Sequence, residues 1–367
     1  MSNIKAHNIV NILETFAPPA FQEDYDNSGL QTGSLDSEVT GLLITLDVTP
    51  EVIEEAIACK INFILSHHPV TLAGIKKMTG SSLPVRIFTE AIRNNLIIYS
   101  AHTNLDSVKD GVSGILARKT GLINCRVLSP RKQLLTKLVT FVPVDYAGKV
   151  RNALFEAGAG HIGKYDCCSY NIEGEGTFRG GEAAHPFVGE KGNVHTESEI
   201  RIETVIPVFL QNKVLKALLA THPYEEPAYD FYLLENKWNE AGFGIIGELP
   251  EPQSPECFLA HLKNVTQTGC IRHTDTIRKT VKTIAVCGGS GSFLLHEAIN
   301  IGADVFVSGD FKYHQFFDAP NTLMIADIGH YESEQFTKEL LLDILTKRFP
   351  DLTLRISGIN SNPIKYC

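Results

Sequence analysis

Short apolar runs alternate with amphipathic stretches in the first third of the chain. Residues 41–46 (GLLITL) form a continuous apolar run of the kind that is buried on both faces of a parallel sheet, and residues 51–60 follow with helical spacing. Apolar runs at 62–66 and 96–101 flank a second helical stretch at 85–95. This alternation predicts an α/β fold.

The same alternation returns near the C-terminus, where strand-like runs at 283–287 and 303–308 flank a helical stretch at 292–302 and a further run follows at 322–326. A shift of 242 residues lays the first unit on the second without a gap and pairs Leu42 with Ile284, Phe63 with Val305 and Ser66 with Ser308. The match predicts an internal strand-helix-strand repeat, with chance agreement between short apolar strands as the alternative.

Residues 131–240 follow a different pattern. Two successive β-α-β units are predicted, with strands at 137–142, 166–173, 200–208 and 227–236, helices at 145–160 and 209–222, and a glycine-rich polar stretch at 174–193 that contributes little to a core. Such units predict a ferredoxin-like α+β domain inserted into the α/β domain. The predicted division is 1–130 and 241–367 for a discontinuous α/β domain and 131–240 for the insert.

Composition narrows the class of protein. The 367 residues, 43% hydrophobic and 20% charged, are typical of a globular chain, and the net charge of -9 disfavours general nucleic-acid binding. Neither a signal-peptide pattern nor an 18-residue apolar stretch occurs, so a cytoplasmic protein without membrane contact is expected. The eight cysteines lack CxxC spacing, which argues against a disulfide framework or a thiolate zinc site.

Metal-competent side chains follow several of the predicted strands, and ligands of open α/β sheets gather beyond the carboxyl ends of the strands. These strand exits carry His67 and His68, His102, Asp310, and His330. Neighbours on a strand point to opposite faces, so His67 and His68 would each take one metal ion. The alternative is a capped strand end with solvated imidazoles.

Two carboxylates extend this set. His330 and Glu334 are four residues apart in a helical stretch and can converge on a metal ion, or they simply form a favourable first helical turn. Asp106 follows His102 by four residues; its carboxylate can bridge two cations, while His102 either shuttles a proton or only stabilises the turn. The nitrogen and oxygen donors suit zinc, iron(II) or manganese in a two-metal hydrolytic site, and they come from His67, His68, Asp106, His330 and Glu334.

A glycine-rich segment at 288–292 lies between a predicted strand and a predicted helix. Its backbone N–H groups could contact a phosphate. It lacks the ending of a P-loop and the spacing of a dinucleotide-binding fingerprint, so a plain tight turn is the alternative.

Together these motifs resemble the GTP cyclohydrolase I type 2 / Nif-three-like family, and the resemblance covers nearly the whole chain. The matching segments are Asp26-Asn27-Ser28-Gly29-Leu30, Leu46-Asp47-Val48-Thr49, Ser66-His67-His68-Pro69, Ala101-His102-Thr103-Asn104-Leu105-Asp106, Ser308-Gly309-Asp310 with His314, and Gly329-His330-Tyr331-Glu332-Ser333-Glu334. The segment 222–230 is similar to the PII/CutA-like insert of longer bacterial members.

The resemblance implies a toroidal homohexamer with two divalent metal ions (zinc, iron or manganese) per subunit. His68 and Asp106 would bind one ion, His67 and His330 the other, and Glu334 would bridge them. The matching positions His102, Asp310 and His314 would line the cavity, where His102 or His314 could carry a proton.

The resulting hypothesis is a metal-dependent hydrolase of a phosphorylated nucleotide, with GTP as the specific substrate and ring opening to formate and a dihydroneopterin triphosphate as the reaction. A shared fold does not establish this activity. The alternatives are a metal-binding regulatory or chaperone-like hexamer without GTP turnover, and a phosphodiesterase or phosphatase.

Overall fold

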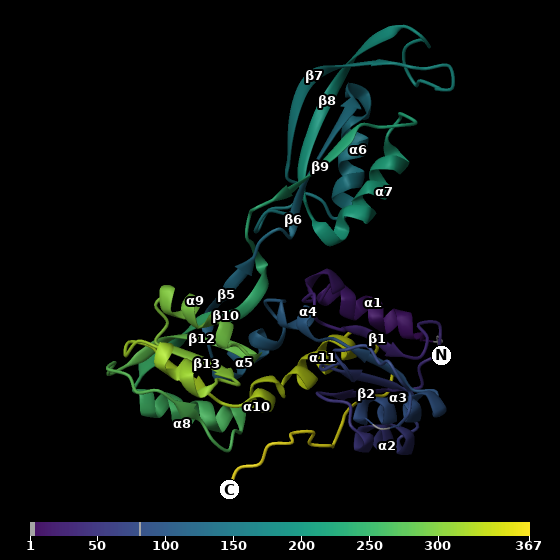
Figure 1. The fold of residues 1–367 in the computed structure, drawn as a ribbon. Helices are drawn as coiled ribbons and strands as arrows, with labels where there is room; N and C mark the ends of the chain where they lie inside the picture. The colour runs from purple at the N-terminus through teal and green to yellow at the C-terminus, as the bar shows by residue number, and fades with distance from the viewer. Residues whose placement is uncertain (1–3, 81) are drawn as a thin grey trace. The chain divides into compact units, whose positions relative to one another are not determined.

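The structure is a computed structural model that describes residues 4–80 and 82–367. It is a mixed α/β structure with several sheets, and the chain divides into two compact units (Figure 1). Unit 1 comprises Met1–Pro130 and Asn239–Cys367, and unit 2 comprises Arg131–Trp238.

The first sheet of unit 1 has the strand order β1-β4-β3-β2-β15. Strand β1 is antiparallel to β4, and the remaining pairs are parallel. The strands are β1 (Gly29–Thr32), β2 (Leu42–Thr45), β3 (Phe63–Ser66), β4 (Ile97–Ser100) and β15 (Leu354–Ile356). The predicted strands at 41–46, 62–66 and 96–101 are therefore confirmed, and all residues of β2, β3 and β4 are buried.

Helices cover both faces of this sheet, which is why its central strands are apolar throughout. Alternate side chains such as Ile44 and Leu65 pack on one face, and Leu43 and Ile64 pack on the other. The first face lies against α1 (Ala6–Phe16) and α11 (Thr337–Thr346), and the second lies against α2 (Pro50–Ala58) and α3 (Leu83–Arg93).

The second sheet of unit 1 has the order β11-β14-β13-β12-β10-β5. Its strands are β5 (Ile123–Arg131), β10 (Trp238–Gln253), β11 (Arg272–His273), β12 (Val281–Ser290), β13 (Val305–Gly309) and β14 (Met324–Asp327). Helices α5 (Val112–Thr120) and α8 (Pro255–Thr266) pack on one face, and α9 (Leu295–Asn300) packs on the other. Short 3-10 turns η3 (Ser292–Leu294) and η4 (Tyr313–Asp318) precede α9 and β14, and η1 (Pro19–Phe21) follows α1.

The internal repeat is confirmed by the pairing of strands in the two sheets. Leu42 on β2 pairs with Phe63 on β3, and Ile284 on β12 pairs with Val305 on β13. These are the residue pairs that the sequence shift matches, and both strand pairs are parallel. Each sheet of unit 1 therefore contains one copy of the same strand-helix-strand unit in the same register.

Unit 2 is a four-stranded antiparallel sheet with the order β7-β8-β6-β9. In chain order its elements are β6 (Leu135–Pro143), α6 (Val144–Glu156), β7 (Ser169–Arg179), β8 (Val194–Pro207), η2 (Val208–Leu210), α7 (Gln211–Thr221) and β9 (Tyr229–Leu234). Figure 1 shows β7 and β8 as a long hairpin. The core contains Leu138, Val150, Ile202 and Leu218 from the sheet and both helices.

The glycine-rich stretch at 174–193 contributes no residue to the core, as predicted, but the strand predicted to end at residue 173 extends into it. Strand β7 continues through Gly174 and Gly176 to Arg179, which pairs with Val194 at the far end of β8. The backbone hydrogen bonds to β8 keep this polar, exposed segment in a strand, so the pattern of side chains alone does not reveal it.

The sequence also led to expectations about the cysteines and about membrane-spanning helices. All eight cysteines are free thiols. Within residues 4–80 and 82–367, every helix is too short or too polar to cross a bilayer.

Candidate metal centre

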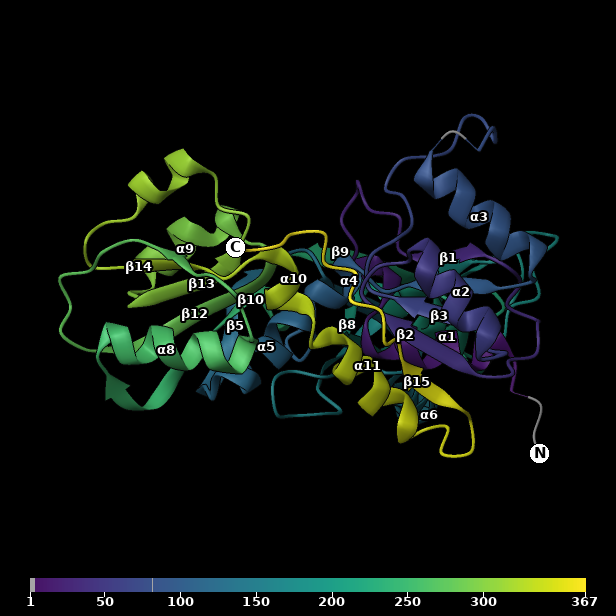
Figure 2. The same cartoon turned by 90° about the horizontal axis from the view of Figure 1, so that it is seen from below.

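Histidine and carboxylate side chains from both sheets of unit 1 converge at one place. His67 and His68 follow β3, Asp106 ends the short helix α4 (Thr103–Asp106) after β4, and the short helix α10 (His330–Glu334) follows β14. Figure 2 shows α10 between the two sheets. The carboxyl ends of the parallel strands thus bring together the residues that the strand-exit pattern singled out.

His67, Asp106 and Glu334 form one group of potential ligands. His67 Nε2 lies 3.6 Å from Asp106 Oδ1 and 3.7 Å from Glu334 Oε1. His67 and Glu334 are almost fully buried. The gap between these atoms is too long for a hydrogen bond and leaves room for an ion between them.

His68, His330 and Glu334 form a second group. Glu334 Oε2 lies 3.0 Å from His68 Nε2 and 3.1 Å from His330 Nε2, and the two imidazole nitrogens are 3.4 Å apart. The i,i+4 spacing of His330 and Glu334 on α10 therefore brings both side chains to one point, as expected for a helix.

The grouping differs from the pairing that the resemblance implies. The geometry places His67 with Asp106 and His68 with His330. The reason is the alternation of neighbouring side chains along the chain. His67 turns toward the Ala101 carbonyl beyond β4, on the side of Asp106, whereas His68 turns toward Asp47 beyond β2.

Each histidine of the cluster is held at Nδ1, which leaves Nε2 facing the others. The distances from Nδ1 to the oxygen are 2.8 Å for His67 and Ala101 O, 2.6 Å for His68 and Asp47, 2.7 Å for His102 and Asp26, and 2.7 Å for His330 and Asp310. Oxygen partners of this kind fix the ring orientation of metal-binding histidines.

Asp310 was expected near the cavity and lies there, and its left-handed backbone (φ 59°) aims its carboxylate at His330. No orienting role could be assigned to Asp26, Asp47 or the Ala101 carbonyl from the sequence. Asp47 directly follows the apolar run at 41–46, so the observation that ligands gather beyond strand ends could have found it.

Two buried atoms of the cluster indicate that it fits a metal ion. Among the described residues, His67 Nε2 and Asp106 Oδ1 are buried without any hydrogen-bond partner. A buried polar atom without a partner is costly, and a bound cation would satisfy both atoms at once. Nitrogen and oxygen donors without thiolate suit a divalent ion such as zinc, iron or manganese.

The charges of the cluster are strongly coupled. Burial and the nearby Glu334 raise the pKa of Asp106 to about 7. Burial opposes ionisation of Glu334 as well, but His67 and His330 outweigh it and hold the pKa of Glu334 well below its usual range. In the absence of cations Glu334 is therefore the anionic centre that the imidazoles surround.

The pKa values of two histidines in the cluster are raised. Burial disfavours the charged form of His68, but the bonds to Asp47 and Glu334 outweigh it and raise the pKa of His68 to about 10. Asp310 and Glu334 likewise overcome burial and raise the pKa of His330 to about 11. A cation that binds here must therefore displace protons.

The two histidines proposed for proton transfer lie in different surroundings. The His102 ring centroid lies 5.3 Å from that of His67 and 5.4 Å from that of His68, and these three residues form a third group of potential ligands. His314 is exposed and packs beside Tyr313 and Phe317, apart from all three groups. The catalytic role of both histidines stays a prediction.

The glycine-rich segment at 288–292 belongs to the end of β12 and the turn after it. Three of its five N–H groups are already used, because Gly288 donates to Ser113, Gly289 to Ser333 and Gly291 to Ser308. A Cβ atom on Gly289 would overlap Glu334 Oε1. The structure thus favours the tight turn over phosphate contact and explains the glycine by the space that Glu334 needs.

Comparison with known proteins places the whole chain in one family. Residues 4–363 match the family described as Duf34/NIF3 (NGG1p interacting factor 3). Relatives named "GTP cyclohydrolase 1 type 2 homolog" from Halalkalibacterium halodurans and Bacillus subtilis are 36% and 35% identical, with 100% and 99% of both chains covered. The crystal structure of a Bacillus cereus protein related to NIF3 matches with a TM-score of 0.86 at 37% identity, with both chains fully covered. The chain therefore belongs to the Duf34/NIF3 family.

Proposed function

We propose that this protein binds two divalent metal ions in the cluster and hydrolyses a phosphorylated nucleotide there. The observation that carries the proposal is the position of Glu334 between two groups of donors. Its Oε1 lies toward His67 and its Oε2 toward His68 and His330. A carboxylate with one oxygen on each side would contribute a donor to each of two ions, and two such ions would supply the chemistry of two-metal hydrolytic sites.

His67, Asp106 and Glu334 would hold one ion, and His68, His330 and Glu334 the other. When bound, such ions supply Lewis acidity and bring the pKa of water toward about 7. Asp26 ties down Nδ1 of His102, so only Nε2 of this ring is free to accept or pass on a proton. Asp47 and Asp310 keep the rings of His68 and His330 in place.

GTP is the first substrate to test, because the relatives carry the name of a GTP cyclohydrolase homologue. Protein reconstituted separately with zinc, iron(II) and manganese is incubated with GTP, and formate and pterin are measured. Turnover with any of these metals supports the specific activity. Release of phosphate alone would favour a phosphatase or phosphodiesterase. Absence of any turnover with metal retained would favour the regulatory or chaperone-like alternative.

The metal site itself has a separate test. The His330→Ala and Glu334→Ala variants should each lose at least one bound ion with the fold retained, because the remaining donors cannot complete two coordination spheres. Elemental analysis measures the metal content, and circular dichroism checks the fold. The exposed His296 provides a control variant, His296→Ala, that should keep its metal. Unchanged metal content in both site variants would contradict the assignment.

The proposal also includes the insert and the assembly. The β-α-β-β-α-β chain order of unit 2 with strand order β7-β8-β6-β9 supports a ferredoxin-like, PII/CutA-like domain. The homohexamer implied by the resemblance is tested by light scattering coupled to size-exclusion chromatography. A mass of one or two subunits would contradict it.

A further inference from the structure

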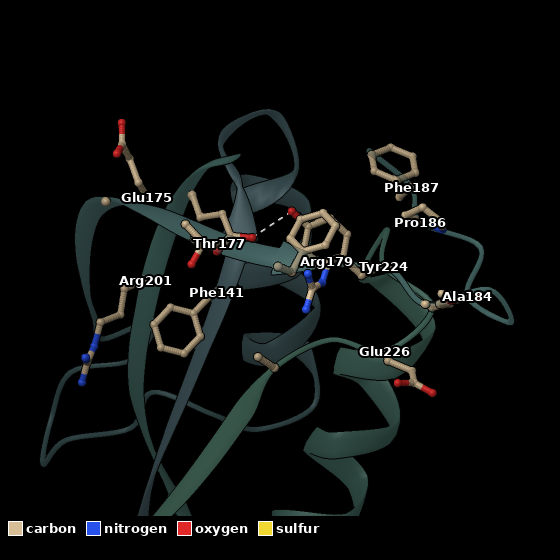
Figure 3. Close-up of a pocket in the computed structure, with 18 of the residues that line it drawn as sticks. Phe141, Glu175, Thr177, Arg179, Ala184, Pro186, Phe187, Arg201, Tyr224 and Glu226 are labelled. Carbon is tan, nitrogen blue, oxygen red and sulfur yellow. Dashed lines mark hydrogen bonds between the residues drawn. The ribbon is translucent and has the colours of Figure 1, made fainter. Parts of the chain in front are cut away.

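Unit 2 contains a cavity of about 660 Å³, far from any residue of the metal cluster in the sequence. This volume lies within the range of small-molecule sites. Its walls come from β6, β7 and β8, the loop between β7 and β8, and the loop between α7 and β9. Figure 3 shows Phe141, Phe187 and Tyr224, which reach the cavity from three different segments.

Glu199 is the most buried ionisable side chain of this cavity, with 7% of its surface exposed. Its Oε1 accepts a hydrogen bond of 2.8 Å from Tyr224 Oη. Burial and this bond raise the pKa of Tyr224, so the phenol keeps its proton and remains a donor. Within the described part of the chain, no group donates a hydrogen bond to Glu199 Oε2. One oxygen of a buried carboxylate is therefore left for a ligand.

The glycines of β7 make room for this carboxylate. Glu199 on β8 pairs with Gly174 on β7, and Gly176 lies two residues further on the same face. A Cβ atom on Gly176 would overlap Glu199 Oε2. A larger side chain at Gly176 would therefore displace the Glu199 carboxylate from its position in the cavity.

Aromatic rings line the cavity next to Tyr224. The ring centroid of Tyr224 lies 6.0 Å from that of Phe178 and 6.3 Å from that of Phe187. The faces of such rings attract cations and pack against apolar groups.

The balance of charge favours a cation as well. Five glutamates and two arginines line the cavity, and Arg201 is paired with Glu203 at 2.8 Å. Arg179 is exposed. An anionic ligand would therefore meet an excess of carboxylates.

We propose that this cavity binds an organic cation, a protonated amine or amidinium on an apolar or aromatic body, that donates a hydrogen bond to Glu199 Oε2 and packs against Phe178 and Tyr224. A charge-assisted hydrogen bond of this kind is stronger than a neutral one. The site lies outside the proposed catalytic centre, and its ligand does not depend on that centre's activity.

The test uses the full chain with benzamidine as the cationic probe and benzamide as its neutral counterpart of nearly equal shape. Isothermal titration calorimetry should show one benzamidine per chain and an affinity for benzamide that is weaker by about tenfold or more, because the neutral amide lacks the charge that Glu199 binds. Equal affinity for the two probes, or no binding of benzamidine, would overturn the proposal.

Variants locate the binding. Glu199→Gln keeps an acceptor for Tyr224 and should weaken benzamidine about tenfold while it leaves benzamide unchanged. Glu182→Gln removes the same charge from an exposed glutamate outside the cavity and should have no effect. Should Glu199→Gln fail to fold, Phe178→Leu keeps the wall apolar without an aromatic face and should also weaken benzamidine selectively. Wild-type affinity in a folded Glu199→Gln protein, or in Phe178→Leu, would contradict the site.

Discussion

The carboxylate of Asp47 holds His68 from the side opposite Glu334. It lies 2.6 Å from His68 Nδ1, and its second oxygen accepts a hydrogen bond from Ser361 at 2.6 Å. His68 Nε2 is thereby directed toward Glu334 and His330. Asp47, which is not among the predicted ligands, therefore fixes the orientation of the His68 imidazole.

Asp47→Asn should weaken metal binding about 10- to 100-fold, because a neutral amide holds the imidazole less firmly than a carboxylate. Competition with a chromophoric chelator measures the affinity. The exposed Asp36 offers a control, Asp36→Asn, of equal change in charge. Equal affinity in the two variants would show that Asp47 has no influence on the site.

Metal affinity should rise with pH. The pKa of His68 is raised to about 10 and that of His330 to about 11, so below these values both rings carry a proton that a metal ion must displace. For each proton displaced, the affinity should increase about tenfold per pH unit until the pH exceeds the pKa of the ring. Chelator competition at several pH values checks this, and an affinity that does not change with pH would contradict it.

At the scale of elements, the end of β12 packs against the short helix α10 at Gly289. Gly289 has a left-handed backbone (φ 62°), and its missing side chain leaves the space that Glu334 occupies. The sequence indicates a turn at this point. It does not reveal that the turn contacts a carboxylate 45 residues further along the chain.

Gly289→Ala should lose metal as well as stability, because its Cβ pushes Glu334 away from the imidazoles. Gly302→Ala is a matched control, since Gly302 also has a left-handed backbone (φ 78°) but open space around its Cβ position. Both variants should lose about 1 kcal/mol of unfolding free energy from backbone strain, measured by urea denaturation. Only Gly289→Ala should lose metal by elemental analysis, and full metal content in this variant would refute the role of the glycine.

The parallel strands β2, β3, β4, β12, β13 and β14 of unit 1 could be predicted because their side chains are mostly apolar on both faces. The sequence does not predict β1, β5, β10, β11 and β15, which lack such continuous apolar runs. The extension of β7 to Arg179 could not be predicted either, since its exposed glycines and polar side chains have no periodic pattern, and the pairing with β8 holds the segment in place.

At the scale of the whole molecule, all five proposed ligands lie in unit 1 but in distant parts of the sequence. His68 and Glu334 are 266 residues apart. Folding must bring both sheets of unit 1 together before the site exists, so metal binding is linked to the stability of this unit.

Added zinc should raise the unfolding temperature of unit 1 and leave that of unit 2 unchanged. The single tryptophan, Trp238, stacks on Phe209 of unit 2 at 6.0 Å but is also the first residue of β10, so its fluorescence does not separate the two units. Calorimetry with and without zinc resolves the two transitions instead. The His330→Ala variant should show a smaller shift in the calorimetric transition. A zinc-dependent shift of both calorimetric transitions by the same amount would contradict this independence.

The sequence by itself determined the α/β alternation, the internal repeat and the polar residues at the strand ends, because each of these is written in local patterns of side chains. Only the tertiary structure decided that His67 groups with Asp106 and His68 with His330, and that Asp47 orients an imidazole. It alone also revealed the cavity around Glu199. These features depend on the directions of side chains and on contacts between distant segments, and such contacts leave no periodic trace in the chain.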